Sequence, residues 1–245
     1  MISATILTKN SEATLATTLE SLKRFPEVLI LDTGSADRTL EIAKAFPNVR
    51  IVNEGFQGFG KTHNVASGLA THDWILSVDS DEVLSPELSA EILGLSLDSK
   101  CVYSLDRHNH FRGKHIKYCA GWHPDRIVRL YHRKATQFSD DRVHEKIITQ
   151  NSRVVPLRHR LIHTPYRTME EFLNKMQFYS TLFAEQNAGV KKSSLGKAIA
   201  HGLAAFLKSY ILKRGFLGGS EGFIISLYNG HTAYYKYLKL AFINK

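Results

Sequence analysis

Cysteines and long apolar runs are scarce in this sequence. Its 245 residues include only Cys101 and Cys119, which are too few for a disulfide framework and lack the spacing of metal ligands. No apolar stretch approaches the roughly 20 residues that a helix needs to cross a bilayer. The amino terminus lacks the basic and apolar regions of a signal peptide. We therefore expect a protein of a reducing compartment, without a signal peptide or membrane-spanning segment.

Charge is abundant but unevenly placed. Hydrophobic residues make up 43% and charged residues 22% of the chain, as in ordinary globular proteins, and the length allows one substantial core with a small second subdomain. The net charge is +9, and residues 191–245 carry nine Lys or Arg against one acid, Glu221. Residues 100–134 are also strongly basic and rich in histidine. This asymmetry predicts an anionic partner: phosphate groups, a membrane surface or nucleic acid.

The first 95 residues alternate between apolar strands and helices. Strands are predicted at residues 2–8, 28–31, 49–52 and 74–78. Helices are predicted at about residues 10–24, 36–46 and 61–70, and Ser85 with Pro86 begins another. This alternation predicts βαβ units and an α/β fold with a mostly parallel sheet.

The rest of the sequence predicts looser strands followed by helices. We expect strands at residues 102–105 and 127–131, an edge strand within 147–155, and helices at 169–187, 195–213 and 221–240. The predicted organisation is an α/β domain at residues 1–165 and a basic helical extension at residues 166–245.

Acidic residues follow the fourth predicted strand. Asp79 and Asp81 are two positions apart, so on an extended chain both side chains leave the same face. Two crowded carboxylates repel one another, and a divalent cation with oxygen ligands, often shared with a phosphate, relieves that repulsion. A solvated turn is the alternative interpretation of the same residues.

Polar groups also follow the other predicted parallel strands. Thr8, Asn10, Asp32 and a glycine-rich loop at residues 55–60 all come at strand ends, as Asp79 and Asp81 do. In parallel sheets, ligands bind beyond the carboxyl ends of the strands. The sequence therefore predicts one binding site built from several strand ends.

The glycine-rich loop also permits a different interpretation. Residues 55–62 match Gly-x-x-x-x-Gly-Lys-Thr, the pattern of a phosphate-binding P-loop, between a strand and a helix. A P-loop NTPase or kinase using Gly55 to Thr62 is therefore an alternative function. Against it, the preceding strand is third in the chain and ends in the polar pair Asn53 and Glu54.

Three motifs stand at these strand ends: Asp32-x-Gly34-Ser35-x-Asp37-x-Thr39, Gly58-x-Gly60-Lys61-x-x-Asn64 and Asp79-x-Asp81. Together they resemble the family 2 glycosyltransferases of the GT-A fold. Three more extend the likeness along the chain: Trp122-x-Pro124-Asp125-x-x-x-Arg129-Leu130, Val143-His144-Glu145 and Lys236-Tyr237-x-Lys239-Leu240. These are similar to the lipopolysaccharide core glycosyltransferases of the glucosyltransferase type.

The resemblance implies a nucleotide-sugar donor site. Asp32 would bind the nucleotide base, with Thr8 and Asn10 beside it. From the residues alone, Asp32 could equally cap the turn before Gly34.

The same resemblance assigns the sugar diphosphate to the following motifs. Lys61 would approach the donor nucleotide, with Asn64 and Ser80 as further donor-binding residues, although Lys61 could also be a solvated helix start. Asp79 would hold the ribose or the metal, and Asp81 the Mn²⁺ or Mg²⁺ that bridges the diphosphate.

His144 and Glu145 form a second candidate chemical group. Inversion at the sugar carbon needs a base for the proton of the attacking hydroxyl. We choose Glu145 for that base and His144 for a further metal ligand, although such a pair is often only a surface pair. The reserve bases are Asp125, Asp140 and Asp141.

An acceptor site is predicted around Trp122. Sugars stack on aromatic faces, and arginine binds phosphate or carboxylate through paired hydrogen bonds. The candidates are Trp122, Asp125, Arg126 and Arg129. The alternative is a core tryptophan with solvated arginines.

The carboxyl-terminal helices mix aromatic residues with lysine. That composition suits an anionic membrane surface, or a helical lid with its lysines facing water. We expect a metal-dependent, inverting hexosyltransferase that moves glucose from UDP-glucose onto a lipopolysaccharide or lipooligosaccharide inner-core sugar. It would be cytoplasmic and peripheral on the inner membrane, with a lipid-linked anionic acceptor and no nucleic acid partner. A non-enzymatic, basic membrane-binding protein is the second alternative.

Overall fold

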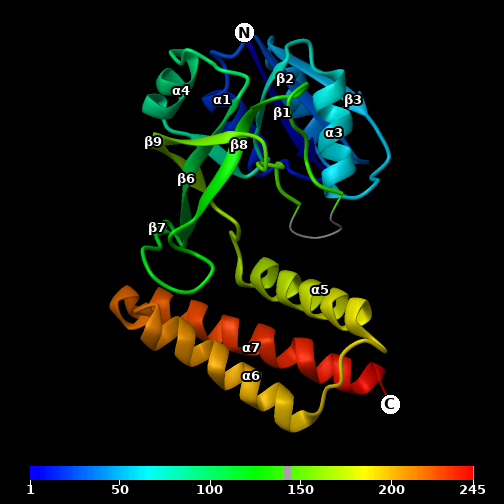
Figure 1. Cartoon of the computed structure of the whole chain (residues 1–245), viewed down its shortest axis with the longest axis vertical. Helices are drawn as coiled ribbons and strands as arrows, with labels where there is room; N and C mark the ends of the chain where they lie inside the picture. Colours follow the sequence, from blue (N-terminus) through cyan, green and yellow to red (C-terminus); the bar gives the residue numbers. More distant parts are fainter. Residues whose placement is uncertain (141–144, 245) are drawn as a thin grey trace. The chain divides into compact units, whose positions relative to one another are not determined.

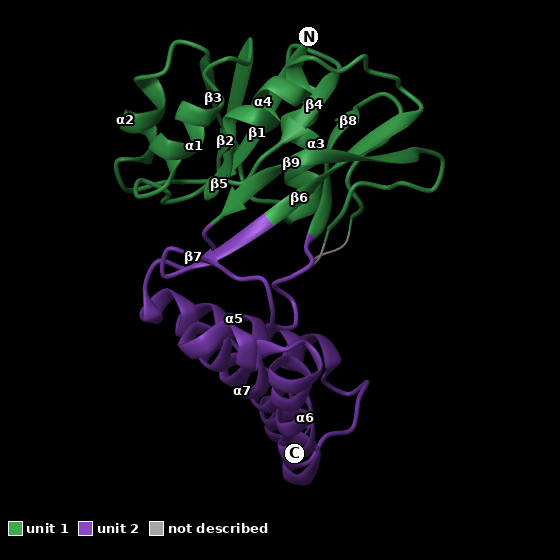
Figure 2. Cartoon of the chain, turned by 90° about the vertical axis from the view of Figure 1, so that its left-hand side faces the viewer, with its two compact units in different colours: residues 1–107, 126–163 green, residues 108–125, 164–245 purple. Residues whose placement is uncertain are grey.

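The computed structural model describes residues 1–140 and 145–244, and the chain forms two compact units (Figures 1 and 2). Unit 1 consists of Met1–Arg107 and Arg126–His163, and unit 2 of His108–Asp125 and Thr164–Lys245. The second junction lies close to the boundary predicted at residue 165. The structure also assigns residues 108–125 to the helical unit.

A mixed sheet forms the centre of unit 1. The strands are β1 Ile2–Thr8, β2 Glu27–Asp32, β3 Val49–Asn53, β4 Trp74–Ser77, β5 Glu82–Leu84, β6 Cys101–Phe111, β7 Lys114–His115, β8 Arg126–His132 and β9 Arg153–His163. Their order is β3-β2-β1-β4-β8-β6-β9-β5, with β7 paired to the far end of β6 in unit 2. The first four strands are parallel, whereas β8 is antiparallel to β4 and β6. The predicted α/β fold is confirmed, with an antiparallel part added to the parallel strands.

Helices cover both faces of the parallel strands. They are α1 Leu15–Ser21, α2 Thr39–Lys44, α3 Phe59–Leu69 and α4 Pro86–Leu93. Every residue of β2 is buried: Val28 and Ile30 pack with α1 and α4, and Leu29 and Leu31 pack with α3. A strand with apolar residues on both faces needs a helical layer on each, as the unbroken apolar run predicts.

The edge strand predicted at residues 147–155 is wrong. Strand β9 begins at Arg153 and lies between β6 and β5. Ile147 instead forms an isolated bridge with Phe138 and packs into the core beneath α3. Ile147 is apolar because it is buried in this core, and its single bridge is not the ladder of backbone hydrogen bonds that a strand requires.

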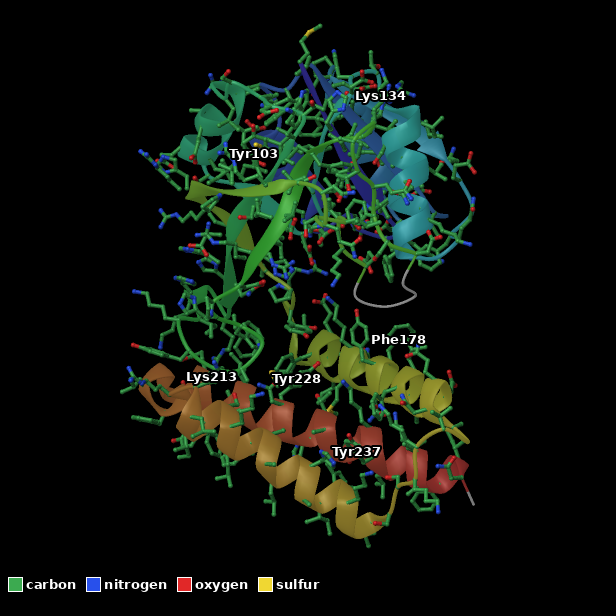
Figure 3. The ribbon with its side chains drawn as sticks, viewed as in Figure 1. Tyr103, Lys134, Phe178, Lys213, Tyr228 and Tyr237 are labelled. Atoms are coloured by element: carbon green, nitrogen blue, oxygen red, sulfur yellow. The ribbon has the colours of Figure 1, made fainter. Side chains whose placement is uncertain are left out.

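Unit 2 is built mainly from three long helices (Figure 1). They are α5 Met169–Asn187, α6 Leu195–Leu207 and α7 Gly219–Ile243, with a π-helical turn at Lys208–Leu212 and a 3-10 turn at Gly215–Gly218. Gly202 of α6 and Gly230 of α7 meet closely, since a Cβ on Gly202 would lie 3.2 Å from the carbonyl oxygen of Gly230. Aromatic residues line α7, where Figure 3 labels Tyr228 and Tyr237. No helix among the described residues is long and apolar enough to cross a membrane.

Candidate functional site

The carboxyl ends of β2, β1 and β4 lie side by side in unit 1. Thr8, the last residue of β1, is paired with Asp32, the last residue of β2. On the other side of β1, Thr5 is paired with Ser77 at the end of β4. Because neighbouring strands are about 4.8 Å apart, β2 and β4 lie roughly 10 Å apart across β1, and β2 extends three residues further along β1 than β4 does. The predicted strand-end residues therefore share one edge.

Hydrogen bonds join these strand ends further. The Asp32 carboxylate accepts hydrogen bonds from the backbone N–H groups of Gly34 and Ser35 at 3.0 and 2.9 Å. The Ser35 hydroxyl accepts one from the Asn10 N–H at 2.9 Å. Asp32 thus caps its turn, as the structural interpretation predicted. It remains at the same edge as Thr8 and Asn10.

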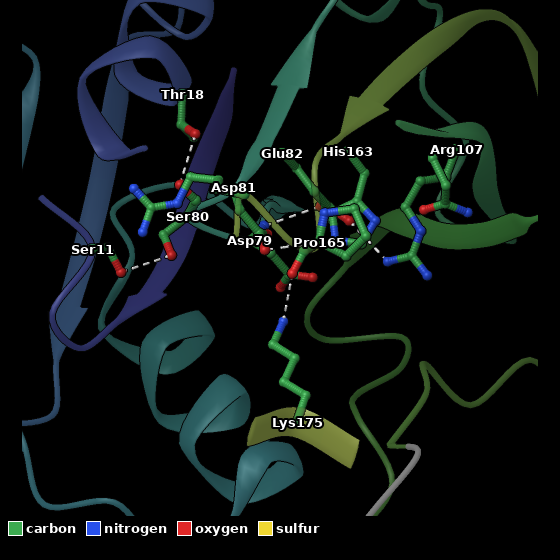
Figure 4. A network of polar contacts seen from close by, with 12 residues as sticks. Ser11, Thr18, Asp79, Ser80, Asp81, Glu82, Arg107, His163, Pro165 and Lys175 are labelled. Atoms are coloured by element: carbon green, nitrogen blue, oxygen red, sulfur yellow. Dashed lines mark hydrogen bonds and ion pairs between the residues drawn. The ribbon is translucent and has the colours of Figure 1, made fainter. Parts of the chain in front are cut away.

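Ser80 connects the β4 end to the segment after β1. Its hydroxyl lies 2.9 Å from that of Ser11, and its carbonyl oxygen accepts a hydrogen bond from the Thr18 hydroxyl at 3.0 Å (Figure 4). These bonds fix the backbone between Asp79 and Asp81. Ser80 therefore holds in place residues 79–82, called here the acidic turn.

The acidic turn is paired with arginines from neighbouring strands. Arg129 of β8 donates hydrogen bonds to the carboxylates of both Asp79 and Glu82, the latter at 2.9 Å. Arg107 of β6 lies 3.0 Å from the same Glu82 oxygen. Glu82 is fully buried, and its second oxygen accepts the Asp79 backbone N–H at 3.0 Å (Figure 4). The pairing satisfies the buried charges and fixes the orientation of Asp79.

Electrostatics in this cluster favour an ionised Asp79. Burial opposes the charge, but the positive charge of Arg129 outweighs it and holds the pKa of Asp79 below its ordinary value. Burial likewise opposes the charge of Arg129, whereas Asp79 and Glu82 raise the pKa of its guanidinium. Burial lowers the pKa of nearby His63 to about 4, so its imidazole is neutral at physiological pH.

Both carboxylates of the Asp79-x-Asp81 motif are partly exposed, the Asp79 side chain to 38% and the Asp81 side chain to 27%. One Asp81 carboxylate oxygen lies 3.6 Å from Nε2 of His163. Within residues 1–140 and 145–244, no group of three or more His, Cys, Asp or Glu side chains is arranged to hold a metal ion. Hard divalent cations are commonly held by one or two carboxylates together with substrate phosphates. The chemistry of Asp79 and Asp81 fits such a shared cation rather than a cage made by the protein alone.

Helix α3 begins at the same sheet edge, after β3. Gly58 precedes it with φ of 98°, a conformation that favours glycine. A Cβ on Gly60 would lie 1.9 Å from the carbonyl oxygen of Ser139 and 3.5 Å from Cβ of Glu145. Gly60 therefore allows the segment that carries Glu145 to approach the first turn of α3, where Lys61 is exposed.

The P-loop interpretation of residues 55–62 is wrong. In that interpretation the Thr62 hydroxyl would be directed at magnesium, but it is buried and donates to the carbonyl oxygen of Gly58 at 2.7 Å. It also accepts the Gln57 N–H at 3.2 Å. The Thr62 hydroxyl is thus used in hydrogen bonds to the backbone of its own glycine-rich loop.

Several predicted site residues have structural partners. The Asn64 amide exchanges two hydrogen bonds with the backbone of Phe138, at 3.0 and 2.9 Å, so its donor-binding role is revised to one of holding that segment. Asp140 is exposed. The predicted metal ligand His144 and the reserve base Asp141 lie outside the described residues.

The stacking role predicted for Trp122 is contradicted by the structure. Trp122 is 6% exposed and packs with Phe111 and Tyr166 in the core of unit 2, where no sugar can stack on it. Asp125 accepts a hydrogen bond from the Asn109 side chain at 2.8 Å, also in unit 2. Arg129 belongs to the acidic turn in unit 1.

Arg126, the fourth acceptor candidate, is exposed on β8. Sequence reasoning also missed residues at the acidic turn: Glu82, Arg107, His163 and His63. Glu82 adjoins the Asp79-x-Asp81 motif, and its acidity was a usable signal. Arg107 and His163 stand in strands far away in sequence, where nothing local indicates that they face the acids.

Comparisons with known proteins agree with this architecture. Residues 3–150 match the sequence model of the family described as "Glycosyl transferase family 2". An uncharacterized glycosyltransferase of Rickettsia typhi is 27% identical over 260 residues, covering 98% of this chain and 85% of that protein. The lipopolysaccharide core biosynthesis glycosyltransferase LpsC of Rhizobium meliloti is 27% identical over 237 residues, covering 91% and 85%. The mannosyltransferase PcManGT from Pyrobaculum calidifontis, solved with GDP-Man and Mn²⁺, has a similar fold, with a TM-score of 0.51 at 13% identity over 95% of this chain and 73% of that one.

Proposed function

Because the chain belongs to glycosyl transferase family 2 and is therefore a glycosyltransferase with the GT-A fold, we propose that it transfers a hexose, with inversion, from UDP-glucose to a lipopolysaccharide or lipooligosaccharide inner-core sugar. The observation that carries the proposal is the shared edge of β2, β1 and β4, where Asp32 and the acidic turn lie about two strand spacings apart. A nucleotide and its diphosphate have the length to reach both.

Each strand end has its own role toward the donor. Asp32, with Thr8 and Asn10 beside it, would bind the nucleotide base, while Asp79 would hold the ribose or the metal and Asp81 the Mn²⁺ or Mg²⁺ at the diphosphate. When bound, such a cation offsets the negative charge that builds on the departing nucleoside diphosphate. Arg129 keeps Asp79 ionised and oriented for this task. The exposed Lys61 adds positive charge at the first turn of α3.

Glu145 acts as the base in this proposal. The acceptor hydroxyl oxygen bonds to the anomeric carbon as the bond from that carbon to the diphosphate breaks, and Glu145 takes the hydroxyl proton. The approach of Glu145 to Gly60 at the start of α3 supports this role, because it brings Cβ of Glu145 to the first turn of that helix.

The proposed acceptor is a lipid-linked, anionic saccharide at the cytoplasmic face of the inner membrane. The name of LpsC, a lipopolysaccharide core biosynthesis enzyme, supports this class of acceptor. The basic carboxyl-terminal segment, with nine Lys or Arg against one acid in residues 191–245, supports a peripheral position on that membrane.

A thermal-shift panel tests the donor. UDP, GDP and ADP and their glucose conjugates are compared with and without Mn²⁺ or Mg²⁺, since a ligand that binds the native state raises its melting temperature. We expect UDP and UDP-glucose with a divalent cation to give the largest shift, and transfer to de-glycosylated core acceptors to follow the same preference. A larger shift with GDP, ADP or either of their glucose conjugates would overturn the choice of donor, and ATP hydrolysis without transfer, measured separately, would overturn the function.

A further inference from the structure

Helix α6 and the turn after it expose an apolar stripe. The side chains recur at every fourth position and are between 45% and 60% exposed: Leu195, Ile199, Leu203, Leu207 and Ile211. Residues four apart lie on one face of a helix, so these side chains form a continuous row, called here the α6 stripe. The row spans a whole helix and is too regular for scattered surface apolar residues.

A groove between α6 and α7 widens this apolar surface. Its volume is about 300 Å³, and the walls come from both helices: Ile199, Leu203, Phe206, Phe223, Leu227 and Tyr234. The floor lies where Gly202 and Gly230 let the two backbones approach. Ile199 and Leu203 belong to both the groove and the α6 stripe, so the two features form one surface, called here the α6–α7 face.

The chain around this face carries positive charge without acids. Between Glu185 and Glu221 the sequence has six Lys or Arg and no acidic residue. Lys197 on α6 and Lys208 on the π-helical turn stand outside the stripe, and Lys213 follows that turn (Figure 3). Glu221, in the first turn of α7, is paired with Lys114 at 3.2 Å. An exposed apolar row beside uncompensated cations is complementary to an anionic lipid surface.

We propose that the α6–α7 face binds the surface of an anionic membrane, with the α6 stripe inserted at the boundary of headgroups and acyl chains. The groove receives an acyl chain, and the lysines beside the stripe contact phosphate headgroups. A second copy of this chain fits less well, because the cations of both copies would oppose one another. The inference adds a defined face and mode of insertion to the membrane position proposed above, and it does not depend on the donor chemistry.

Vesicle flotation tests this proposal. The vesicles contain phosphatidylethanolamine with phosphatidylglycerol, or phosphatidylcholine alone. The unaltered protein should float with the anionic vesicles, less so at high salt, and remain unbound with the neutral ones. Leu203→Asp should weaken binding by about tenfold or more, because it places a charge in the inserted row. The matched control Leu173→Asp, an exposed leucine on α5, should bind like the unaltered protein.

A second readout separates insertion from surface adsorption. Leu203→Cys, labelled with an environment-sensitive dye, should shift its emission to the blue on anionic vesicles, and labelled Leu173→Cys should not. The native Cys101 and Cys119 are buried, which directs the label to the new thiol. This readout also serves if Leu203→Asp fails to fold.

Two outcomes would overturn the proposal. One is equal vesicle binding by Leu203→Asp and Leu173→Asp together with an unshifted Leu203→Cys label. The other is a stable dimer that Leu203→Asp dissociates, which would assign the face to a second copy. Stabilisation of each variant by UDP with Mn²⁺ is measured in parallel, so failure of donor binding is distinguished from failure of membrane binding.

Discussion

Arg129 of β8 forms an ion pair with Asp79, the first acid after the end of β4. The pair joins the antiparallel part of the sheet to the edge where the parallel strands end. Glu82 accepts from the same guanidinium, so one buried cation holds two carboxylates in place. The acidic turn is therefore oriented before any ligand arrives.

Removing Arg129 should destabilise the fold. Arg129→Met leaves Asp79 unpaired and Glu82 with Arg107 as its remaining arginine partner among the described residues. We expect the free energy of unfolding to fall by about 1 to 3 kcal/mol, because the buried Glu82 loses a charged hydrogen bond and the partly exposed Asp79 loses its ion pair. Urea denaturation measures it. The control Arg126→Met, an exposed residue of the same strand, should change it by less than about 0.5 kcal/mol. Similar losses for both variants would contradict the structural role of the pair.

Glu27 should make stability depend on acidity. Burial opposes its charge, but hydrogen bonds from Ser3, Thr71 and Arg50 prevail and lower its pKa from 4.5 to about 2. A carboxyl whose pKa is lower in the folded state stabilises fully above pH 4.5, and that contribution is lost as the pH falls toward 2. The shift corresponds to about 3 kcal/mol at neutral pH.

Urea denaturation of Glu27→Gln over that pH range checks this expectation. The stability gap between the unaltered protein and Glu27→Gln should narrow as the pH is lowered from 7 toward 2. The exposed Glu20 provides the control, and Glu20→Gln should show a small gap at every pH. A gap of constant size for Glu27→Gln would refute the assignment.

Gly60 should be intolerant of a side chain. The added Cβ of Gly60→Ala would collide with the Ser139 carbonyl oxygen, so the segment that carries Glu145 must shift. We expect a loss of about 1 to 3 kcal/mol in stability and a larger proportional loss in transfer rate. Gly68→Ala, in the same helix with open space around it, should be neutral or stabilising by up to about 1 kcal/mol. If transfer assays found Gly60→Ala as active as Gly68→Ala, the proposed role of Gly60 in positioning the Glu145 segment would be wrong.

Glu145→Gln should abolish the chemical step and spare donor binding. Loss of a general base typically lowers turnover by about 10² to 10⁴-fold, while the affinity for UDP should stay unchanged. Single-turnover transfer and UDP titration measure the two quantities. Asp140→Asn, at an exposed neighbouring position, is the matched control. If Asp140→Asn lost turnover and Glu145→Gln kept it, the base would have to be reassigned.

The parallel strands and their polar ends could be predicted from the sequence. Each strand is a short apolar run, and in β2 the run is unbroken because helices cover both faces. Parallel pairing then places Thr8, Asp32 and the acidic turn at one edge, whatever the details of packing. The long helix α5 was also predictable, because Thr168 caps it through the Glu171 N–H.

The partners of the predicted residues could not be read from local patterns. Arg129 was predicted to bind the acceptor because the sequence around an arginine does not show which acid it pairs with across a sheet. Trp122 appeared suited to stacking, but Phe111 at the end of β6 and Tyr166 before α5 pack against it and bury it. A strand was predicted from residue 147 because Ile147 is apolar. Ile147 packs in the core outside any strand, and β9 begins only at Arg153.

The most direct test of the account is calorimetric titration of UDP with and without Mn²⁺, on the unaltered protein and on Asp81→Asn. In the proposed function, the ends of β2, β1 and β4 hold one nucleotide diphosphate through a cation at the acidic turn. UDP should bind the unaltered protein at least about tenfold more tightly with Mn²⁺, a difference of about 1.4 kcal/mol. Asp81→Asn should lose that cation dependence while it unfolds normally. Equal affinity for UDP with and without Mn²⁺, unchanged by Asp81→Asn, would contradict the account.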